Sequence, residues 1–377
     1  MKLAYRIAVY TLFAMTLLLN LLSWTWNGFS DIYRDAVFGY ASFPLRSLSG
    51  MAEGSVGEIL LCVGLGLILF SLLAAAGLLI RLAKGKKASW QVLYFKCFLL
   101  LLAVVSLIMT LNCFILYHCS SLERLYYPDA EGREYDLEEL KELRNRIVLQ
   151  VNEMSSLFER DEDENLIYAP GMEEMKKKAA GSVKALEGSI SQLSGAYNMP
   201  KELRFSAFMS QQRMEGYYFP FSMEANINGD MSEILKPAAM CHELAHTKGF
   251  MYEDEANFIA YLACVSSDDP YFQYSGYLCV LNYVDNDFYR ALGSREAYDA
   301  YPAISERVRR DSRFLTDGGK KKMEEEAWLP TDQVEKAAES FISGNLTANG
   351  IREGSLSYGK VVRLLLDHDE AALHAGP

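Results

Sequence analysis

The chain has 377 residues, of which 50% are hydrophobic, and its formal net charge is −12. It is too apolar for a disordered protein and too long for one small domain. The charge is uneven, because residues 1–117 carry nine Lys and Arg against four Asp and Glu, whereas residues 118–377 carry 28 against 45. The acidic carboxy-terminal part argues against a nucleic-acid-binding protein, which needs clustered positive side chains.

Three stretches free of charged residues are long enough to cross a bilayer, since about 20 apolar residues span its hydrocarbon core. They cover residues 7–30, 59–80 and 97–122. We expect transmembrane helices at about 7–27, 59–80 and 97–117, within a membrane domain of residues 1–122. A cleaved secretory signal is a less favoured interpretation of the first stretch, because its apolar run is long and no small-residue cleavage motif follows.

Lys and Arg residues beside these stretches predict their orientation, because positively charged loops stay in the cytoplasm. Lys2, Arg6 and the loop from Arg81 to Lys87 fall on one side, whereas the loop of residues 31–58 has only two arginines. We therefore predict a multi-pass protein of the cell membrane, with a cytoplasmic amino terminus and an extracytoplasmic domain at residues 123–370. The lack of charge within the three stretches argues against a channel or transporter.

The extracytoplasmic domain begins with a helix signal. Asp136 and Glu139 have the spacing of a capping box, in which each side chain accepts a hydrogen bond from the other residue's backbone. Apolar residues then recur at helical spacing from Leu137 to Leu157. A second helix is predicted over residues 172–193.

Two further segments have strand patterns. Residues 204–210 alternate between apolar and polar side chains, and residues 217–228 mix aromatic and polar ones, with Pro220 favouring a sheet edge. The remainder is predicted to be helical, apart from a frayed tail at residues 371–377. The sequence thus predicts a mainly α protein in which three amino-terminal transmembrane helices precede a domain with a small sheet.

The segment His242-Glu243-Leu244-Ala245-His246 has the His-Glu-x-x-His pattern. Residues four apart share one face of a helix, so both imidazoles can reach a single zinc ion while Glu243 points to its open side. Pro237 and Gly249 suit the start and the end of such a helix. We predict a zinc site with His242 and His246 as ligands and Glu243 as the catalytic base.

A catalytic zinc site needs a third protein ligand. Glu253, Asp254 and Glu255 are the first ligand-type residues after Gly249. We favour Glu253, because it shares a helix face with Asn257, which could hydrogen-bond a ligand from behind. Glu255 would face away and remains the alternative, and Asp254 is the least favoured.

The segments CHELAHTKGF and EDEANF resemble the gluzincin group of zincin metallopeptidases, whose second helix carries Glu-x-x-x-Asp or Asn. The chain departs from the best-studied members in the short interval between His246 and Glu253. Three spans followed by FPFSMEANIN, HELAH, EDEANF, ERVRRD and SYGKVVRLLL also resemble, over nearly the full chain, an uncharacterised bacterial membrane family of unknown function. The resemblance implies a zincin-like α+β domain outside the membrane.

We therefore expect a membrane-anchored zinc peptidase that hydrolyses peptide or protein substrates outside the cytoplasm. The alternative is a non-catalytic module anchored in the lipid bilayer, with a structural or vestigial zinc site, that binds cell-envelope partners. The sequence leaves the substrate and the oligomeric state open. It also does not select the group that would stabilise an oxyanion. The candidates are Tyr252, Tyr274, Tyr277, Tyr301 and Arg307.

Overall fold

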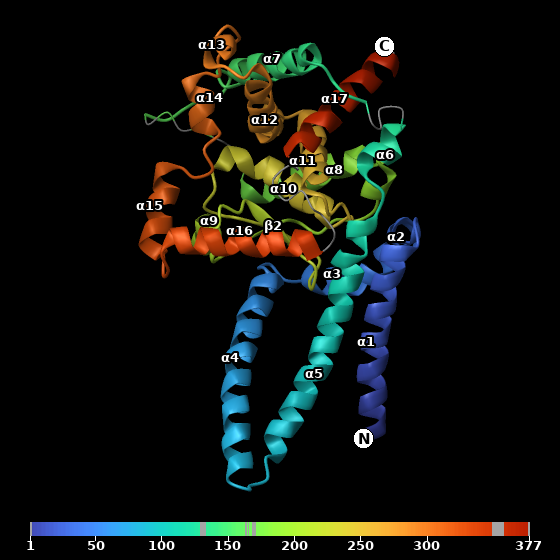
Figure 1. Cartoon of the computed structure of the whole chain (residues 1–377). Helices are drawn as coiled ribbons and strands as arrows, with labels where there is room; N and C mark the ends of the chain where they lie inside the picture. Colours follow the sequence, from blue (N-terminus) through green and yellow to red (C-terminus); the bar gives the residue numbers. More distant parts are fainter. Residues whose placement is uncertain are drawn as a thin grey trace. The chain divides into compact units, whose positions relative to one another are not determined.

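The computed structural model describes residues 2–128, 133–162, 164, 166–167, 171–348 and 358–375. Their secondary structure is predominantly helical, as the sequence predicts, with three short strands (Figure 1). The chain divides into two compact units. Unit 1 comprises Met1–Cys119 and Phe219–Glu224, and unit 2 comprises Ser120–Tyr218 and Ala225–Pro377. Unit 1 thus includes a six-residue segment that lies far along the sequence from its other residues.

The three predicted apolar stretches all form long helices in unit 1. They are α1 (Lys2–Thr25), α4 (Val56–Ala83) and α5 (Ser89–Met109), the last prolonged by the π-helix η2 (Thr110–Phe114) and the 3-10 helix η3 (Leu116–His118). Each is long and apolar enough to cross a membrane. The predicted starts of the second and third helices were too late, because Glu58 and Lys96 lie inside α4 and α5. A charge is tolerated near a helix end, where a long side chain can reach polar surroundings.

Unit 1 also contains short helices and a few polar contacts between its long ones. The short helices are α2 (Phe29–Tyr33), the π-helix η1 (Arg34–Phe38) and α3 (Gly39–Ser49). The Asn20 amide nitrogen donates to the Thr110 hydroxyl at 2.9 Å, which joins α1 to η2. The Tyr33 hydroxyl donates to the Leu111 carbonyl at 2.9 Å, which joins α2 to the same π-helix.

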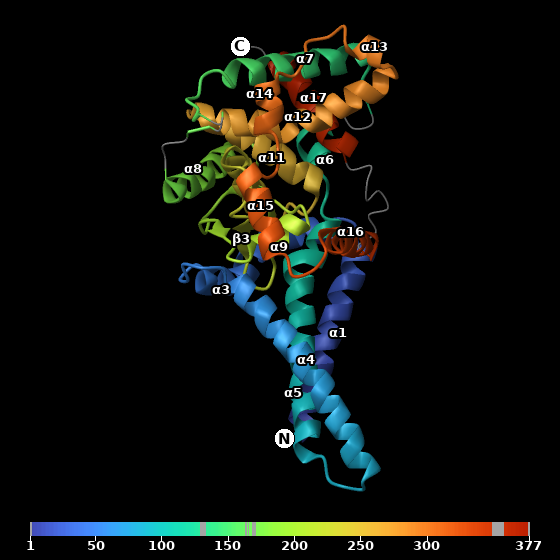
Figure 2. The ribbon, with the colours of Figure 1, turned by 90° about the vertical axis from the view of Figure 1, so that its left-hand side faces the viewer.

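The core of unit 2 is built from six helices of ten or more residues. They are α7 (Leu137–Met154), α8 (Met172–Ala185), α10 (Lys236–His246), α11 (Glu253–Val265), α12 (Pro270–Leu292) and α17 (Tyr358–Ala375). α11 packs against α10, α12, α8 and α17, and Figure 2 shows it within this group of helices. Accordingly Ala256, Phe258 and Ile259 of α11 are fully buried. The central position of α11 fixes the side chains at its amino-terminal end.

The predicted signals of α7 are present in the structure. The Asp136 carboxylate accepts from the Glu139 backbone amide at 2.9 Å, and the Glu139 carboxylate accepts from the Asp136 amide at 2.9 Å, so the predicted capping box is confirmed. The apolar face from Leu143 to Met154 is buried, whereas Leu137, at the start of α7, is 44% exposed. α8 ends at Ala185, before the predicted residue 193.

The other described helices complete unit 2. They are α6 (Leu122–Tyr126), η5 (Leu186–Gly188), η6 (Ser191–Leu193), α9 (Ser206–Gln211), η7 (Glu233–Leu235), α13 (Arg295–Tyr298), α14 (Glu306–Asp311), α15 (Asp317–Glu326) and α16 (Thr331–Ala348). α17 continues to Ala375, beyond the predicted start of a frayed tail at residue 371, and residues 376–377 lie outside the described ranges. The first part of α17 remains ordered because Val361, Leu364 and Leu365 are buried in the core.

The three strands form one small sheet with the order β1-β3-β2. β1 (Lys201–Glu202) runs parallel to β3 (Glu224–Ile227), with Lys201 opposite Asn226, and β2 (Gly216–Phe219) is at the edge. The strand predicted over residues 204–210 is wrong, since most of that segment is helix α9; its alternation was too short to distinguish the two structures. The segment 217–228 is a hairpin, with Pro220 in the turn between the strands.

Candidate metal centre

Helix α10 carries the His-Glu-x-x-His segment at its carboxy-terminal end. Pro237 lies in its first turn, where the missing backbone N–H costs nothing, and the helix ends at His246. Gly249 has a φ of 96°, a left-handed conformation that glycine adopts without a steric penalty. The Phe250 amide then donates back to the Ala245 carbonyl at 3.4 Å. The chain therefore reverses after α10 and returns to the site as α11.

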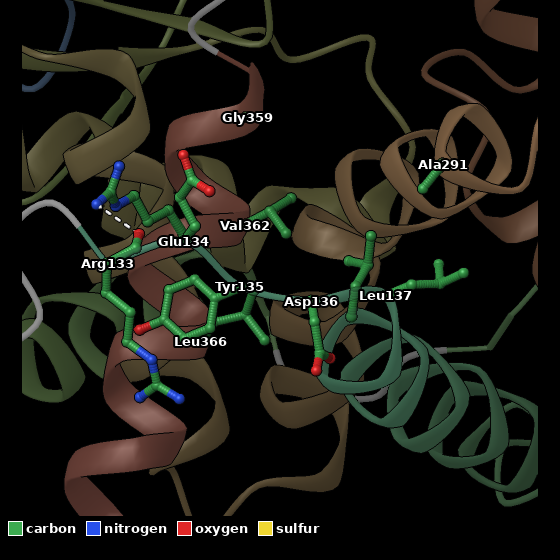
Figure 3. Close-up of a pocket in the computed structure, with 11 residues that line it drawn as sticks. Arg133, Glu134, Tyr135, Asp136, Leu137, Ala291, Gly359, Val362 and Leu366 are labelled. Carbon is green, nitrogen blue, oxygen red and sulfur yellow. Dashed lines mark hydrogen bonds between the residues drawn. The ribbon is translucent and has the colours of Figure 1, made fainter.

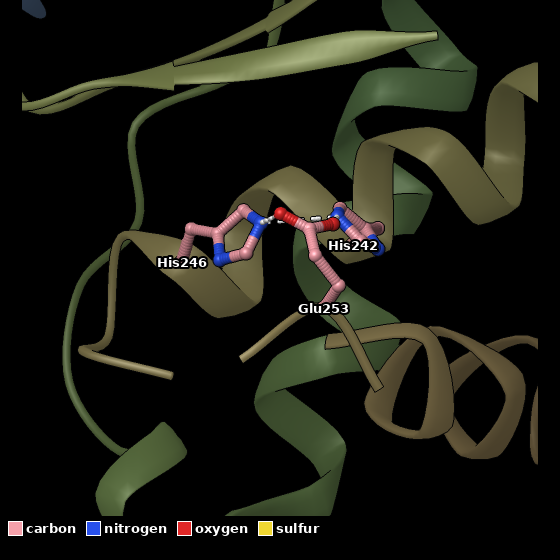
Figure 4. Close-up of side chains that lie close together, drawn as sticks. All are labelled: His242, His246 and Glu253. Atoms are coloured by element: carbon pink, nitrogen blue, oxygen red, sulfur yellow. Dashed lines mark hydrogen bonds and ion pairs between the residues drawn. The ribbon is translucent and has the colours of Figure 1, made fainter. Parts of the chain in front are cut away.

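Figure 4 shows His242, His246 and Glu253 pointing toward one another from these two helices. The two Nε2 atoms of the histidines are 3.0 Å apart. The Glu253 carboxylate lies 3.1 Å from Nε2 of His242 and 3.8 Å from Nε2 of His246. The Glu253 side chain is 59% exposed, so the cluster of His242, His246 and Glu253 is open to solvent at Glu253.

Both imidazoles are oriented by a second hydrogen bond. Nδ1 of His242 lies 2.9 Å from the Asn257 amide oxygen, and Nδ1 of His246 lies 2.6 Å from the Phe250 carbonyl oxygen. Each oxygen is an acceptor, so the proton of a neutral imidazole is placed on Nδ1 and the lone pair on Nε2. Both lone pairs are therefore directed to the same space beside Glu253.

The structure separates the acidic residues at the start of α11. Glu253 joins the histidines, whereas the Glu255 carboxylate accepts a hydrogen bond from the Leu122 amide at 2.6 Å and is buried on another face. Asp254 is not part of the group of His, Cys, Asp and Glu side chains that lie close enough for one ion among the described residues. Helical geometry explains the difference, since consecutive residues are about 100° apart around the axis.

Glu243 is buried beside this group, and its Oε2 atom has no hydrogen-bond partner among the described residues. Gly216 of β2 covers it, because a Cβ atom at that position would lie 2.6 Å from Oε1 of Glu243. Only glycine therefore leaves room for the carboxylate in its present position. Buried carboxylate oxygens usually have a hydrogen-bond partner, so this oxygen marks Glu243 as a candidate functional residue.

The donor set fits zinc. A tetrahedral ion with bonds of about 2.1 Å to nitrogen holds two nitrogen atoms roughly 3.4 Å apart. The separation of 3.0 Å between the Nε2 atoms is close to this value. Two imidazoles and one carboxylate are also the ligands of several catalytic zinc sites, with the fourth position open.

The residues of this cluster shift one another's pKa values. Burial lowers the pKa of His242, but the hydrogen bond and charge of Glu253 outweigh it and raise the value to about 9. Desolvation raises the pKa of Glu253, yet its bond to His242 and the charges of the histidines lower it to about 2. Desolvation lowers the pKa of His246 to about 4 and raises that of Glu243 to about 8.

Most of the predicted oxyanion candidates have partners elsewhere in unit 2. The Tyr274 hydroxyl donates to Asp311 at 2.7 Å, the rings of Tyr277 and Tyr301 pack on Tyr261 and Phe288, and Arg307 pairs with Glu164. Tyr252 directly precedes Glu253. The residue missed by the sequence analysis is Tyr218 of β2, whose ring centre lies 6.4 Å from that of His246. No spacing links it to the motif, because a separate strand brings it there.

A family model matches nearly the whole chain. The chain belongs to the DUF3810 family, described as a protein of unknown function, whose model matches residues 33–366. This agrees with the resemblance to an uncharacterised family. No curated protein and no solved structure matches the chain.

Proposed function

Because membership of this family assigns no activity, the function rests on the site itself, and we propose that the protein is a membrane-anchored zinc peptidase. One observation carries the proposal. His242, His246 and Glu253 each direct a ligand atom to a common space, with all three atoms within 4.8 Å of one another, beside the buried and unpartnered Oε2 atom of Glu243. A zincin-like domain would combine these groups in the same way.

In the proposed mechanism, His242, His246 and Glu253 hold the ion. Zinc, when bound, lowers the pKa of water and polarises a carbonyl group. Glu243 takes a proton from the attacking water molecule and passes it to the leaving amine nitrogen as the peptide bond breaks. Asn257 and the Phe250 carbonyl keep the two imidazoles in their orientation.

We place the substrate outside the cytoplasm. The charges beside α1 and in the loop between α4 and α5 support a cytoplasmic amino terminus, and an odd number of spans would bring unit 2 to the opposite side. The outer position of β2 in the described sheet supports a peptide substrate, because an extended peptide can add a strand to the edge of a sheet.

The test is the variant Glu243→Gln in the full-length protein, reconstituted in lipid nanodiscs. The amide keeps the size of the side chain but is not a base. We expect bound zinc to stay at about one ion per chain, while turnover of a peptide library falls by about 10²–10⁴. Mass spectrometry of the digest and elemental analysis measure the two quantities.

The matched control is Glu174→Gln on the exposed surface of α8, which should change neither quantity. Wild-type turnover in the Glu243→Gln variant would refute the mechanism. Zinc bound by an inactive wild-type chain would instead favour the non-catalytic module.

A further inference from the structure

Lys248 lies in the turn after α10, and its side chain is buried, with 8% of the residue exposed. Its ammonium group donates to the Ser194 carbonyl at 2.7 Å and to the Ala196 carbonyl at 3.1 Å. It also lies 3.9 Å from the centre of the Tyr197 ring, whose face attracts a cation. Burial of a charged group is unfavourable unless such partners replace its hydration. These contacts therefore fix the ammonium group in one place.

The partners of this ammonium group belong to one short segment of unit 2, Ser194–Tyr197, here called the lysine-binding loop. Gly195, between the two accepting carbonyls, has a φ of 92°, a left-handed conformation that favours glycine. The Tyr197 hydroxyl donates to the Leu193 carbonyl at 2.5 Å, and the Leu193 side chain is fully buried in the core. Lys248 thus attaches the turn after α10 to a loop that is itself attached to the core.

The same turn carries the acceptor that orients His246. The Lys248 amide donates to the Ala245 carbonyl at 2.9 Å, and two residues later the Phe250 carbonyl lies 2.6 Å from Nδ1 of His246. The bond that closes the turn, from the Phe250 amide to the Ala245 carbonyl, is 3.4 Å long, beyond the usual range for an N–H···O bond. The position of the Phe250 carbonyl therefore depends on side-chain contacts, including those of the buried Phe250 ring and the Lys248 ammonium group.

We propose that Lys248 is a positioning residue for the metal centre, and that its bonds to the lysine-binding loop keep the Phe250 carbonyl in place beside His246. The consequence for catalysis rests on the proposed peptidase function. When the ammonium group is lost, the loop no longer holds the turn, and the Phe250 carbonyl moves away from Nδ1. The imidazole of His246 then rotates more freely, its Nε2 lone pair is directed less often to the shared space, and zinc is bound more weakly.

The experiment compares wild type with Lys248→Met in the full-length protein, reconstituted in lipid nanodiscs. Methionine keeps an apolar, unbranched side chain but has no charge and no donor. We expect the zinc dissociation constant, measured by chelator competition, to rise by about ten-fold or more, as is typical when a partner of a ligand is lost. The amides of residues 247–252 should exchange with solvent about ten-fold faster, because hydrogen bonds to a charged group are lost. Peptide turnover should fall at limiting zinc and recover in excess zinc.

Lys236→Met is the matched control, because Lys236 is a buried lysine at the other end of α10. It is 2% exposed and pairs with Glu202 at 3.2 Å and with Glu233 at 2.6 Å. We expect this variant to be less stable than wild type, since the contacts of a buried charge are lost. Its zinc dissociation constant and the exchange of residues 247–252 should nevertheless stay at the wild-type values.

Two variants of Tyr197 test the same contact from the lysine-binding loop. Tyr197→Phe keeps the ring, so its zinc dissociation constant should stay within about two-fold of wild type. Tyr197→Leu removes the ring from the ammonium group and should raise the constant by about three-fold or more. This milder pair keeps the test decisive if Lys248→Met does not fold.

Unchanged zinc affinity in both Lys248→Met and Tyr197→Leu would overturn the positioning role, whether or not the protein is a peptidase. Equal losses of zinc affinity in Lys248→Met and Lys236→Met would also overturn it, because general destabilisation would then explain both. Weaker binding in Lys248→Met alone, in a protein that binds zinc but cleaves no peptide, would support the positioning role and refute the peptidase. A wild type that binds no zinc would refute the metal centre and this inference together.

Discussion

Glu253 and Glu255 are two residues apart on α11, yet their carboxylates have different partners. Glu253 faces the two histidines, and Glu255 accepts from the backbone of Leu122 at the start of α6. The helical period alone predicted that these two side chains lie on different faces of α11, because the period fixes the direction of each side chain around the helix axis. The partner of Glu255 was not predictable, since it lies more than a hundred residues earlier in the sequence.

Replacing Glu253 by Gln should weaken zinc binding. A neutral amide is a poor substitute for a carboxylate ligand, so we expect the dissociation constant to rise by about 100-fold or more. Competition with a chromophoric chelator measures this constant. An unchanged constant would remove Glu253 from the set of ligands.

Replacing Glu255 by Gln is the matched change on the other side of the same turn of α11. We expect zinc affinity to be kept, while the free energy of unfolding falls by about 1–3 kcal/mol, because a buried hydrogen bond to a charged group is weakened. Chemical denaturation followed by circular dichroism measures the loss. If this variant lost zinc and Glu253→Gln kept it, the third ligand would be Glu255.

Among the elements, α17 shows how charged side chains attach a helix to its neighbours. The Tyr135 hydroxyl donates to Asp367, Arg133 pairs with Glu370, and Arg363 pairs with Glu123 at 3.0 Å. Figure 3 shows the pocket of about 430 Å³ that Arg133 and Tyr135 line together with residues of α17. These pairs connect α17 to the segment before α7 and to α6.

Asp367 should make stability depend on pH. Desolvation raises the pKa of its carboxyl group from 3.8 to about 6, so the native state holds a proton that the unfolded chain has lost in this range. The free energy of unfolding should therefore fall as the pH rises from about 4 to 6, by up to about 3 kcal/mol.

The variant Asp367→Asn isolates this effect, because an amide keeps an acceptor for Tyr135 and does not titrate. Above pH 6 the variant should be more stable than wild type, and the difference should shrink toward pH 4. Denaturant unfolding at a series of pH values measures the difference. A difference that is independent of pH would contradict the pKa shift.

Helices were more predictable than strands for a physical reason. The spans, α7 and α10 have long patterns or end signals such as Asp136, Pro237 and Gly249, which act within a few residues. The sheet depends on pairing between distant segments, and β1 has only two residues, so its parallel alignment with β3 leaves no periodicity to detect. The predicted strand at residues 204–210 failed because its alternation was too short to distinguish a strand from the helix α9.

At the scale of the whole molecule, the charge distribution predicts the topology. Arg81 to Lys87 form a positive loop between α4 and α5, which should stay in the cytoplasm. A reporter that is active only after export should be active when fused after Arg124 and inactive when fused at Lys86. Activity at Lys86 with none at Arg124 would reverse the orientation.

The sequence predicted an apolar amino-terminal part and an acidic carboxy-terminal part. It did not predict how the residues are divided between the two units. The apolar stretches and the acidic remainder are visible in composition. The membership of Phe219–Glu224 in unit 1 is not, because Glu224, Ser222 and Pro220 resemble ordinary turn residues until their partners near Val56 and Asn112 are known.

This division of the chain has a consequence for its synthesis. A ribosome makes α4 and α5 first, and then residues 120–218 of unit 2, before the loop Phe219–Glu224 emerges. Until then, the amides of Val56 and Gly57 and the side chain of Asn112 lack their partners in that loop. Unit 1 is therefore completed only after residues 120–218 of unit 2 have been made, and a nascent chain that stops before Phe219 exposes an unfinished apolar unit to chaperones and proteases.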